Sequence, residues 1–195
     1  TIALLGDSMT DTLGKDAKEL IGAVRTIYPD LTTRILNYGV GGTNLEDAIT
    51  RITAEHTYLG VTYPPLATQK PDIIVIESCG YNPFIKPEGA LDRHWLALAH
   101  MVDAVRAHLP STKIVIAATI APNDTVFGDG AAGLSFGQND KKQRVAVIKQ
   151  YLDNAIRFAK SERIPLADAY SPSLGSDGNG KLEYINTGDH IHYSP

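Results

Sequence analysis

The sequence predicts an α/β protein in which helices cover both faces of a parallel β-sheet. Short apolar runs alternate with amphipathic segments along the chain, without internal repeats, low-complexity tracts or linkers. The run 73–76, Ile-Ile-Val-Ile, is apolar on both faces, which is typical of a central strand in a parallel sheet. Strict alternation of strands and helices implies right-handed crossovers that cover both faces of the sheet. The expected architecture is therefore a three-layer α/β/α sandwich.

Five segments have the length and composition of strands. They consist mainly of aliphatic and β-branched residues and are bounded by glycine, proline or polar residues. They span residues 2–5, 32–38, 73–76, 113–118 and 164–167. A five-stranded parallel sheet wound in this way is flavodoxin-like, and its expected strand order is 2-1-3-4-5.

Helices are expected between the strands, where apolar residues recur at steps of three and four. The expected helices span about residues 13–27, 43–52, 91–109 and 145–159. Pro29 ends the first of them, and Thr43 or Asn44 is the expected N-cap of the second.

Composition limits the classes of protein to which the chain can belong. At 195 residues with 43% hydrophobic content, the chain is expected to form a single domain over residues 1–195. The net charge of -4 and the lack of a basic run argue against nucleic acid as a partner, and no apolar stretch is long enough to span a membrane. We expect a soluble protein, either cytoplasmic or secreted with its leader removed. The sequence is compatible with any oligomeric state.

The single cysteine, Cys79, excludes an internal disulfide and a cysteine-based zinc site. Cys79 follows the central strand and is expected to be a small buried residue rather than a nucleophile. A metal site formed by Asp189, His190 and His192 is disfavoured, because no further histidine or acid is placed to complete it. We therefore expect no metal and no cofactor.

Gly6-Asp7-Ser8 directly follows the first predicted strand. Ligands of parallel sheets bind outside the carboxyl ends of the strands, which is where this serine is expected to lie. Alone, Ser8 is more typical of a helix cap, because a serine hydroxyl becomes a nucleophile only beside a base and oxyanion donors. Asp7 is expected to be a turn residue that hydrogen-bonds the backbone.

Other polar residues fall at the same edge of the predicted sheet. Gly42 follows the second strand, Asn82 follows the third, and Asp189 and His192 lie beyond the fifth. A histidine can take and return a proton at neutral pH, and a carboxylate three residues earlier can orient it. Each of these residues also fits a simple turn or surface position, which is the usual role of its residue type when it occurs alone.

Four blocks of the sequence together resemble the SGNH hydrolase family, the GDSL-type esterases and lipases. The blocks are Gly6-Asp7-Ser8, Asn37-Tyr38-Gly39-Val40-Gly41-Gly42, Gly80-Tyr81-Asn82 and Asp189-x-x-His192, and they follow the order of the family across nearly the whole chain. The resemblance implies cofactor-free hydrolysis of esters on a flavodoxin-like fold. It also implies the site residues: Ser8 as nucleophile, Ser8, Gly42 and Asn82 as oxyanion donors, His192 as base and Asp189 as its partner.

Two features depart from the pattern of the family. The third block usually continues with an acid, where this chain has Pro83. Family members usually continue past the histidine into a C-terminal helix, whereas the sequence stops at Pro195, so we expect either that this helix is absent or that the sequence is part of a longer chain. These departures favour one alternative to the enzyme, a non-catalytic carbohydrate- or ligand-binding module on the same fold.

The expected substrate is a small-molecule or glycan ester with a short acyl group, such as an O-acetylated carbohydrate. Segments 56–70 and 121–138 are expected to be loops that border the cleft, and they carry tyrosine, proline, glycine and polar residues rather than a long apolar stretch. Tyr38, Tyr81 and His190 lie within the blocks, beside the residues with implied roles, and are candidate substrate contacts. A lipase- or lysophospholipase-type activity is the alternative within the family.

Overall fold

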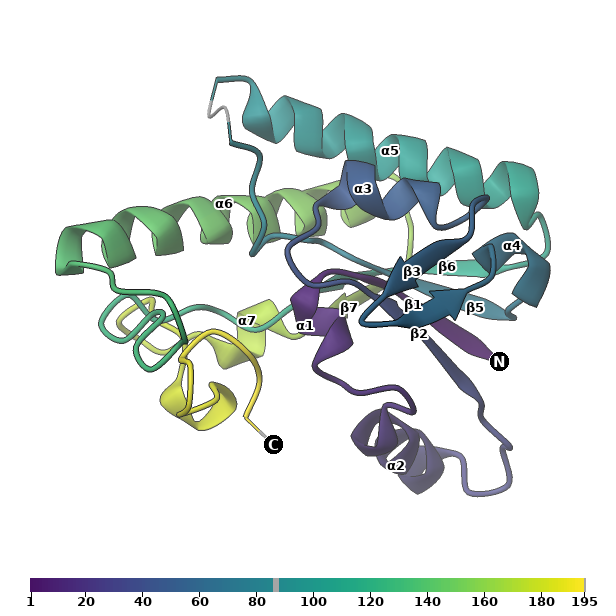
Figure 1. Cartoon of the computed structure of the whole chain (residues 1–195), viewed down its shortest axis with the longest axis horizontal. Helices are drawn as coiled ribbons and strands as arrows, with labels where there is room; N and C mark the ends of the chain where they lie inside the picture. The colour runs from purple at the N-terminus through teal and green to yellow at the C-terminus, as the bar shows by residue number, and fades with distance from the viewer. Residues whose placement is uncertain (86–87, 195) are drawn as a thin grey trace.

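The computed structural model describes residues 1–85 and 88–194 and contains a five-stranded parallel sheet (Figure 1). Its strands are β1 (Ile2–Gly6), β2 (Ile35–Gly39), β5 (Ile73–Glu77), β6 (Lys113–Ala118) and β7 (Leu166–Asp168). Their spatial order is β2-β1-β5-β6-β7, which confirms the order expected from the sequence. The carboxyl ends of the strands therefore meet at one edge of the sheet.

Helices on both faces of the sheet complete a three-layer α/β/α sandwich, with α3, α5 and α6 on one face and α2 on the other (Figure 1). These helices are α2 (Lys18–Ile27), α3 (Leu45–Thr50), α5 (Ala90–His108) and α6 (Gln138–Ser161). Shorter helical turns are α1 (Ser8–Asp11), α4 (Leu66–Gln69), α7 (Tyr170–Ser173) and the 3₁₀ turn η1 (Leu182–Tyr184). No helix within the described ranges is both long and apolar enough to cross a membrane.

The main core lies between the sheet and helices α3, α5 and α6. Ile74 and Ile76 of β5 are fully buried there against Leu98 and Met101 of α5 and Phe158 of α6. Burying each such side chain contributes about 1.5–3 kcal/mol. This face of the sheet therefore supplies most of the hydrophobic stabilisation of the fold.

The opposite face of the sheet is covered less completely. Leu20 and Ile21 of α2 pack in a small cluster with Leu4 of β1. Val75 and Val115 share the face of Leu4, because the three residues are neighbours in the parallel register, and both valines are only partly buried. Helix α2 has no fully buried residue, so its packing contributes less than that of α5 or α6.

Residues 56–70 contain regular structure that the sequence analysis assigned to a loop. Strands β3 (His56–Tyr58) and β4 (Val61–Tyr63) form an antiparallel hairpin, and α4 follows it. Leu59 and Gly60 at the hairpin turn have φ angles of 47° and 76°, because a two-residue hairpin of the favoured twist needs positive φ at both positions. Leucine rarely adopts this conformation, so the Leu-Gly pair gave no turn signal.

Other boundaries also differ from the sequence prediction, and α6 begins at Gln138 rather than at residue 145. The first predicted helix is divided into α1 and α2, and Gly14 and Ala17 between them have φ angles of 75° and 40°, which no α-helix contains. β2 begins at Ile35 rather than at residue 32, since Ile35 is the first residue that pairs with β1. β7 begins at Leu166 rather than at residue 164, because Leu166 is the first residue that pairs with β6.

Helix α1 packs directly on the ends of β1 and β2 because both strands end in glycine. A Cβ atom on Gly39 would lie 2.3 Å from the backbone nitrogen of Asp11 in α1. A Cβ atom on Gly6 would lie 2.6 Å from the Cβ atom of Glu77 on the neighbouring strand. Glycine is needed at these two positions for the close approach of other groups.

We predict that Gly39→Ala lowers the free energy of unfolding by about 3 kcal/mol, because the added methyl group meets the backbone of α1, which cannot move away as a side chain could. Urea denaturation measures this change. The matched control is Gly22→Ala, at an exposed position of α2 with nothing within 4 Å of the added Cβ atom. The control should raise stability by about 0.5–1 kcal/mol, so equal effects of the two variants would contradict the prediction.

Candidate active site

Ser8 is the first residue of α1 and directly follows the turn at the end of β1. Asp7 is the N-cap of α1, because its Oδ1 accepts a hydrogen bond from the Met9 N–H at 2.8 Å. Asp7 and Met9 are buried, whereas Ser8 between them is partly exposed. The turn therefore holds Ser8 at the carboxyl edge of the sheet, and Asp7 has the backbone-bonding role expected from the sequence.

The loop after β2 approaches Ser8. A Cβ atom on Gly41 would lie 3.7 Å from the Cβ atom of Ser8 and 3.0 Å from the Tyr58 hydroxyl oxygen. Gly42 has a φ angle of 75°, in the left-handed region that favours glycine. Nothing lies within 4 Å of a Cβ atom placed on Gly42, so this residue borders open space at the edge of the sheet.

Arg51, directly after α3, fixes this loop to the sheet. Its Nη1 donates to the carbonyl oxygens of Gly6, at 3.0 Å, and Tyr38, and its Nη2 donates to Thr43 Oγ1 at 3.0 Å. Arg51 is 3% exposed, and burial lowers the pKa of its guanidinium from the usual value. No local sequence pattern points to Arg51, because an arginine at the end of a short amphipathic helix is usually exposed.

Asn82 lies in the turn after β5 and is tied to the turn after β1. Its Nδ2 donates a hydrogen bond to Asp7 Oδ2 at 2.8 Å. Its backbone N–H donates to the Cys79 carbonyl oxygen at 3.1 Å. Cys79 is buried, as expected, and has a φ angle of 49°. The Asn82 side chain is thus held by Asp7, and Pro83 follows it in the turn.

Glu77, the last residue of β5, is a buried acid that the sequence analysis missed. Its Oε2 accepts the Asp7 N–H at 3.0 Å, and its Oε1 accepts the Cys79 N–H at 2.7 Å and the Ser78 hydroxyl at 3.2 Å. Burial raises the pKa of Glu77 well above its usual range, and the neighbouring Asp7 carboxylate raises it further.

The carboxyl oxygens of Asp7 and Glu77 and the thiol of Cys79 lie within 4.8 Å of one another, a donor set of the kind that can bind a metal ion. Hydrogen bonds already occupy both carboxyl groups. Burial also raises the pKa of the Cys79 thiol well above its usual value, whereas metal binding requires the thiolate. This cluster is better suited to joining the two turns than to holding a metal ion.

A short turn brings Asp189 and His192 together. Asp189 Oδ2 lies 2.8 Å from His192 Nδ1, and Oδ1 accepts the backbone N–H groups of Ile191 at 2.8 Å and His192 at 3.0 Å. Burial opposes ionisation of Asp189, but hydrogen bonds from the His192 ring and from these N–H groups outweigh it and lower the pKa of the carboxyl. The carboxylate assigns the proton of a neutral ring to Nδ1 and leaves Nε2 as the acceptor.

Residues 184–186 and 192–194 run side by side near the end of the chain. The Asn186 N–H donates to the His192 carbonyl oxygen at 2.8 Å, and the Ser194 N–H donates to the Tyr184 carbonyl oxygen at 2.9 Å. These hydrogen bonds hold the turn that contains Asp189 and His192. Pro195 lies outside the described residues.

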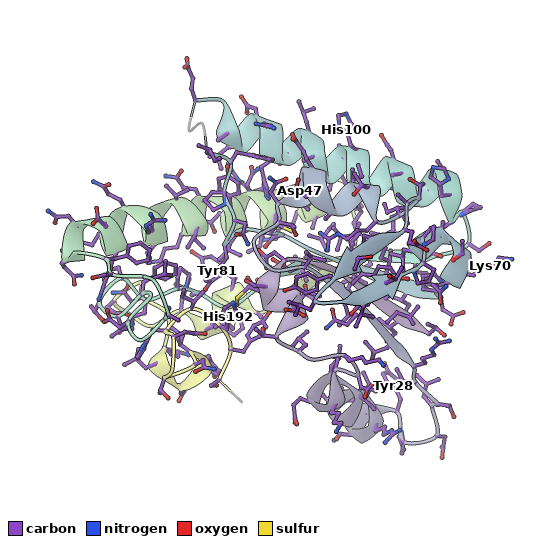
Figure 2. The ribbon with its side chains drawn as sticks, in the orientation of Figure 1. Tyr28, Asp47, Lys70, Tyr81, His100 and His192 are labelled. Carbon is purple, nitrogen blue, oxygen red and sulfur yellow. The ribbon has the colours of Figure 1, made fainter. Side chains whose placement is uncertain are left out.

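Tyr193 anchors this segment against α1. It packs in an apolar cluster that contains Met9, Ile185 and Tyr81. Because Met9 follows Ser8 and Tyr193 follows His192, the cluster brings Ser8 and His192 into the same region. Figure 2 labels His192 and Tyr81 in the part of the molecule that lies between α6 and the C-terminal segment.

Among the residues that the structure describes, no hydrogen bond connects Ser8 with His192. His192 Nε2 is buried there without any hydrogen-bond partner. Few buried polar atoms in proteins are unpaired, and those that are often belong to functional sites. The structure thus pairs Asp189 with His192 and Asp7 with Asn82, and it leaves the acceptor nitrogen of His192 unpaired.

The three candidate substrate contacts occupy different surroundings. Tyr38 is buried, and its hydroxyl donates to the Pro64 carbonyl oxygen at 2.9 Å. His190 Nδ1 lies 2.7 Å from the Asp129 carbonyl oxygen, so its ring ties the C-terminal segment to the loop before α6. Tyr81 is partly exposed and lines a groove beside the candidate site.

This groove has a volume of about 1000 Å³ and includes Gly42 and Asn82 in its wall. It lies between the turn after β5, the first turn of α5 and the middle of α6. Aromatic and aliphatic side chains form much of the wall: Tyr81, Phe84, Phe127, Val147, Ile148 and Tyr151. Polar side chains complete it: Asn44, Asp92, Gln143, Arg144 and Gln150. The wall of the groove therefore contains two of the three predicted oxyanion donors, Gly42 and Asn82, but not Ser8.

His94 of α5 supports the turn after β5 from behind. Its Nε2 donates to the Ser78 carbonyl oxygen at 2.8 Å, and its Nδ1 accepts a hydrogen bond from Asn154 Nδ2 of α6 at 3.0 Å. Both bonds can form only with a neutral ring, since a protonated ring has no acceptor nitrogen. Burial lowers the pKa of His94 to about 4, although the bond to Ser78 opposes this shift.

Solved structures with the same fold include lipases and esterases. The chain superposes on a lipase/acylhydrolase from Enterococcus faecalis with a TM-score of 0.65 and 17% identity, over 99% of this chain and 86% of the other. A GDSL-like lipase from Bacteroides thetaiotaomicron gives a TM-score of 0.65 and 14% identity, over 99% and 79% of the two chains. A variant of an acetyl xylan esterase from Geobacillus stearothermophilus gives 0.57 and 18%, over 93% and 87%. At these identities the similarity establishes the fold.

The fold and the four blocks are consistent with a family of lipases and acylhydrolases. Residues 4–195 match the model of the GDSL-like lipase/acylhydrolase family, and the chain belongs to this family. No curated protein matches the chain in sequence. The family match confirms the resemblance inferred from the four sequence blocks.

We predict that His94 makes the fold less stable as the pH falls from about 6.5 to 4. The unfolded chain binds a proton on this residue near pH 6.5 and the folded chain only near pH 4, so acid favours the unfolded state within this window. The shift corresponds to a loss of about 3 kcal/mol by pH 4. Urea denaturation between pH 7 and pH 4.5 measures it in the wild type and in His94→Gln, whose free energy of unfolding should fall less steeply. Parallel pH dependences would contradict the prediction.

Proposed function

We propose that this chain is a serine esterase that hydrolyses carboxylic esters through an acyl-enzyme. The observation that carries the proposal is the Asp189–His192 pair. Asp189 assigns the ring proton to Nδ1, and the buried Nε2 has no partner in the region where the Ser8 turn packs. An oriented base with an unused acceptor nitrogen is what a serine nucleophile requires.

In the proposed reaction, Ser8 Oγ forms a bond to the ester carbonyl carbon while its proton passes to His192 Nε2. The bond between the carbonyl carbon and the alcohol oxygen then breaks, and His192 gives its proton to the departing alcohol. Water attacks the acyl-enzyme with the same histidine as base, which releases the carboxylic acid and regenerates Ser8. Asp189 stabilises the imidazolium that forms in each half of the reaction.

Three N–H donors are candidates for binding the oxyanion. Among the hydrogen bonds of the described residues, the backbone N–H groups of Ser8 and Gly42 donate to no protein group. The Asn82 amide carries two N–H bonds and uses one of them on Asp7, which leaves the other available. In the proposed site these donors stabilise the tetrahedral intermediate, and losing one such donor typically costs about 100- to 1000-fold in rate.

We predict that Ser8→Ala lowers hydrolysis of p-nitrophenyl acetate by more than about 1000-fold, because the variant cannot form the acyl-enzyme. Wild type should also be labelled at Ser8 by a fluorophosphonate probe, and Ser8→Ala should not. Ser161→Ala, at an exposed position of α6, is the matched control and should behave as wild type. A folded wild type that neither turns over the ester nor reacts with the probe would instead indicate a non-catalytic ligand-binding module.

The proposed substrates combine a short acyl group with a larger alcohol, such as an O-acetylated carbohydrate. An acetyl group fills only a small part of a groove of about 1000 Å³, so we assign most of the groove to the alcohol. Tyr81, Phe84 and Phe127 offer rings to the apolar face of a sugar, and the amides of Asn44 and Gln143 can bond its hydroxyl groups. Apolar walls with a few polar groups are typical of small-molecule sites.

We predict that Val147→Trp lowers kcat/KM for acetylated xylobiose by about tenfold and changes that for ethyl acetate by less than twofold. Val147 lines the groove and is 37% exposed, so the larger ring narrows the space for the alcohol. Ala146→Trp is the matched control, since this exposed neighbour is not part of the wall. Wild type should also prefer p-nitrophenyl acetate to the octanoate. Preference for the octanoate would favour a lipase-type activity.

A further inference from the structure

We infer that Glu77 is a positioning residue that holds the nucleophile turn and the Asn82 turn in a fixed relation. The nucleophile turn is Gly6-Asp7-Ser8, and the Asn82 turn is Ser78–Asn82. The inference rests on the proposed esterase activity and adds to it a residue outside the four sequence blocks. Glu77 touches neither substrate nor reacting atoms in this proposal and acts through the backbone of both turns.

One carboxyl group bonds both turns directly. Oε2 of Glu77 accepts the backbone N–H of Asp7, the residue before Ser8, at 3.0 Å. Oε1 accepts the backbone N–H of Cys79 at 2.7 Å and the Ser78 hydroxyl at 3.2 Å. The two turns follow different strands, β1 and β5, so their relative position depends on contacts between them. Glu77 supplies such a contact to the backbone on each side.

Asp7 completes the connection through its side chain. Oδ1 of Asp7 caps α1 by accepting the Met9 N–H, and Oδ2 accepts the amide of Asn82. The N–H of Asp7 in turn donates to Glu77. A shift of Asp7 relative to β5 would therefore move both Ser8, which is next to it in the chain, and the Asn82 side chain, which is bonded to it.

The backbone of the Asn82 turn also needs this support. Cys79 has a φ angle of 49°, a conformation that costs a non-glycine residue free energy and persists only where its surroundings enforce it. Its N–H bonds Glu77, and its carbonyl oxygen accepts the N–H of Asn82. Cys79 thus transmits the position of Glu77 to Asn82.

Glutamate suits this position better than its amide would. Both carboxyl oxygens of Glu77 are acceptors, so the group accepts hydrogen bonds from both turns. Glutamine has a single acceptor oxygen, and its nitrogen can only donate. Glu77→Gln therefore leaves either Asp7 or Cys79 without its acceptor, whichever way the amide points.

The test compares wild type, Glu77→Gln and the control Ile74→Val. We expect Glu77→Gln to lower kcat for p-nitrophenyl acetate by about 100-fold with KM nearly unchanged, because displacement of reacting groups by about 1 Å has an effect of this size. The rate of fluorophosphonate labelling should fall in parallel. Ile74 lies on the same strand and faces the main core, so Ile74→Val should lower stability and leave kcat within twofold.

A double-mutant cycle with Asn82→Ala separates positioning from a general loss of stability. If Glu77 acts partly through Asn82, Glu77→Gln costs less in the Asn82→Ala background than in wild type, whereas independent effects multiply. Multiplied effects, a changed KM with unchanged kcat, or a Glu77→Gln variant as active as wild type would each overturn the inference while the esterase stands. A wild type without activity and without labelling overturns both.

Ser78→Ala provides a second route if Glu77→Gln does not fold. The Ser78 hydroxyl donates to Glu77 Oε1 and accepts the Gly80 N–H at 3.4 Å, so its removal loosens the same contact with a smaller change in the core. Circular dichroism identifies which variants are folded. We expect Ser78→Ala to lower kcat several-fold at constant KM, and an unchanged kcat would overturn the inference.

Discussion

The arrangement at the edge of this sheet depends on two carboxyl groups buried side by side. Asp7 and Glu77 are both nearly inaccessible to water, and two buried negative charges at this separation would repel strongly. Burial and the Asp7 charge raise the pKa of Glu77 well above its usual range, which favours the neutral carboxyl, and its two oxygens accept N–H groups from both turns. The turns after β1 and β5 therefore form one hydrogen-bonded unit.

Two glycines and Arg51 allow the neighbouring segments to pack closely against this unit. Gly6 and Gly39 end their strands without a side chain, so α1 can lie directly on them. Arg51 neutralises part of the buried negative charge and bonds the carbonyl groups at the ends of both strands. Gly42, in the loop after β2, borders the groove at the same edge of the sheet. Three neighbouring strands thus present their terminal residues within a small region.

Much of the fold could be predicted because its signals are local. Apolar runs and helical spacing identified the strands of the main sheet, and alternation of strands and helices predicted a parallel sheet of the flavodoxin-like order that the structure has. The hairpin over residues 56–63 was missed because a Leu-Gly turn is unusual, and the division between α1 and α2 was missed because apolar spacing continues across it. In both places a non-glycine residue, Leu59 or Ala17, adopts a positive φ angle that its residue type does not predict.

The sequence by itself determined the family, the layered fold and the four blocks, including the Asp189–His192 spacing that a single turn can close. Only the tertiary structure decided which residues support those blocks. Glu77 and Asp7 are 70 residues apart, and Arg51 and Gly6 are 45 apart, so no local pattern pairs them. The physical reason is that a buried charge is tolerated only with partners, and the folded chain supplies these partners from distant segments.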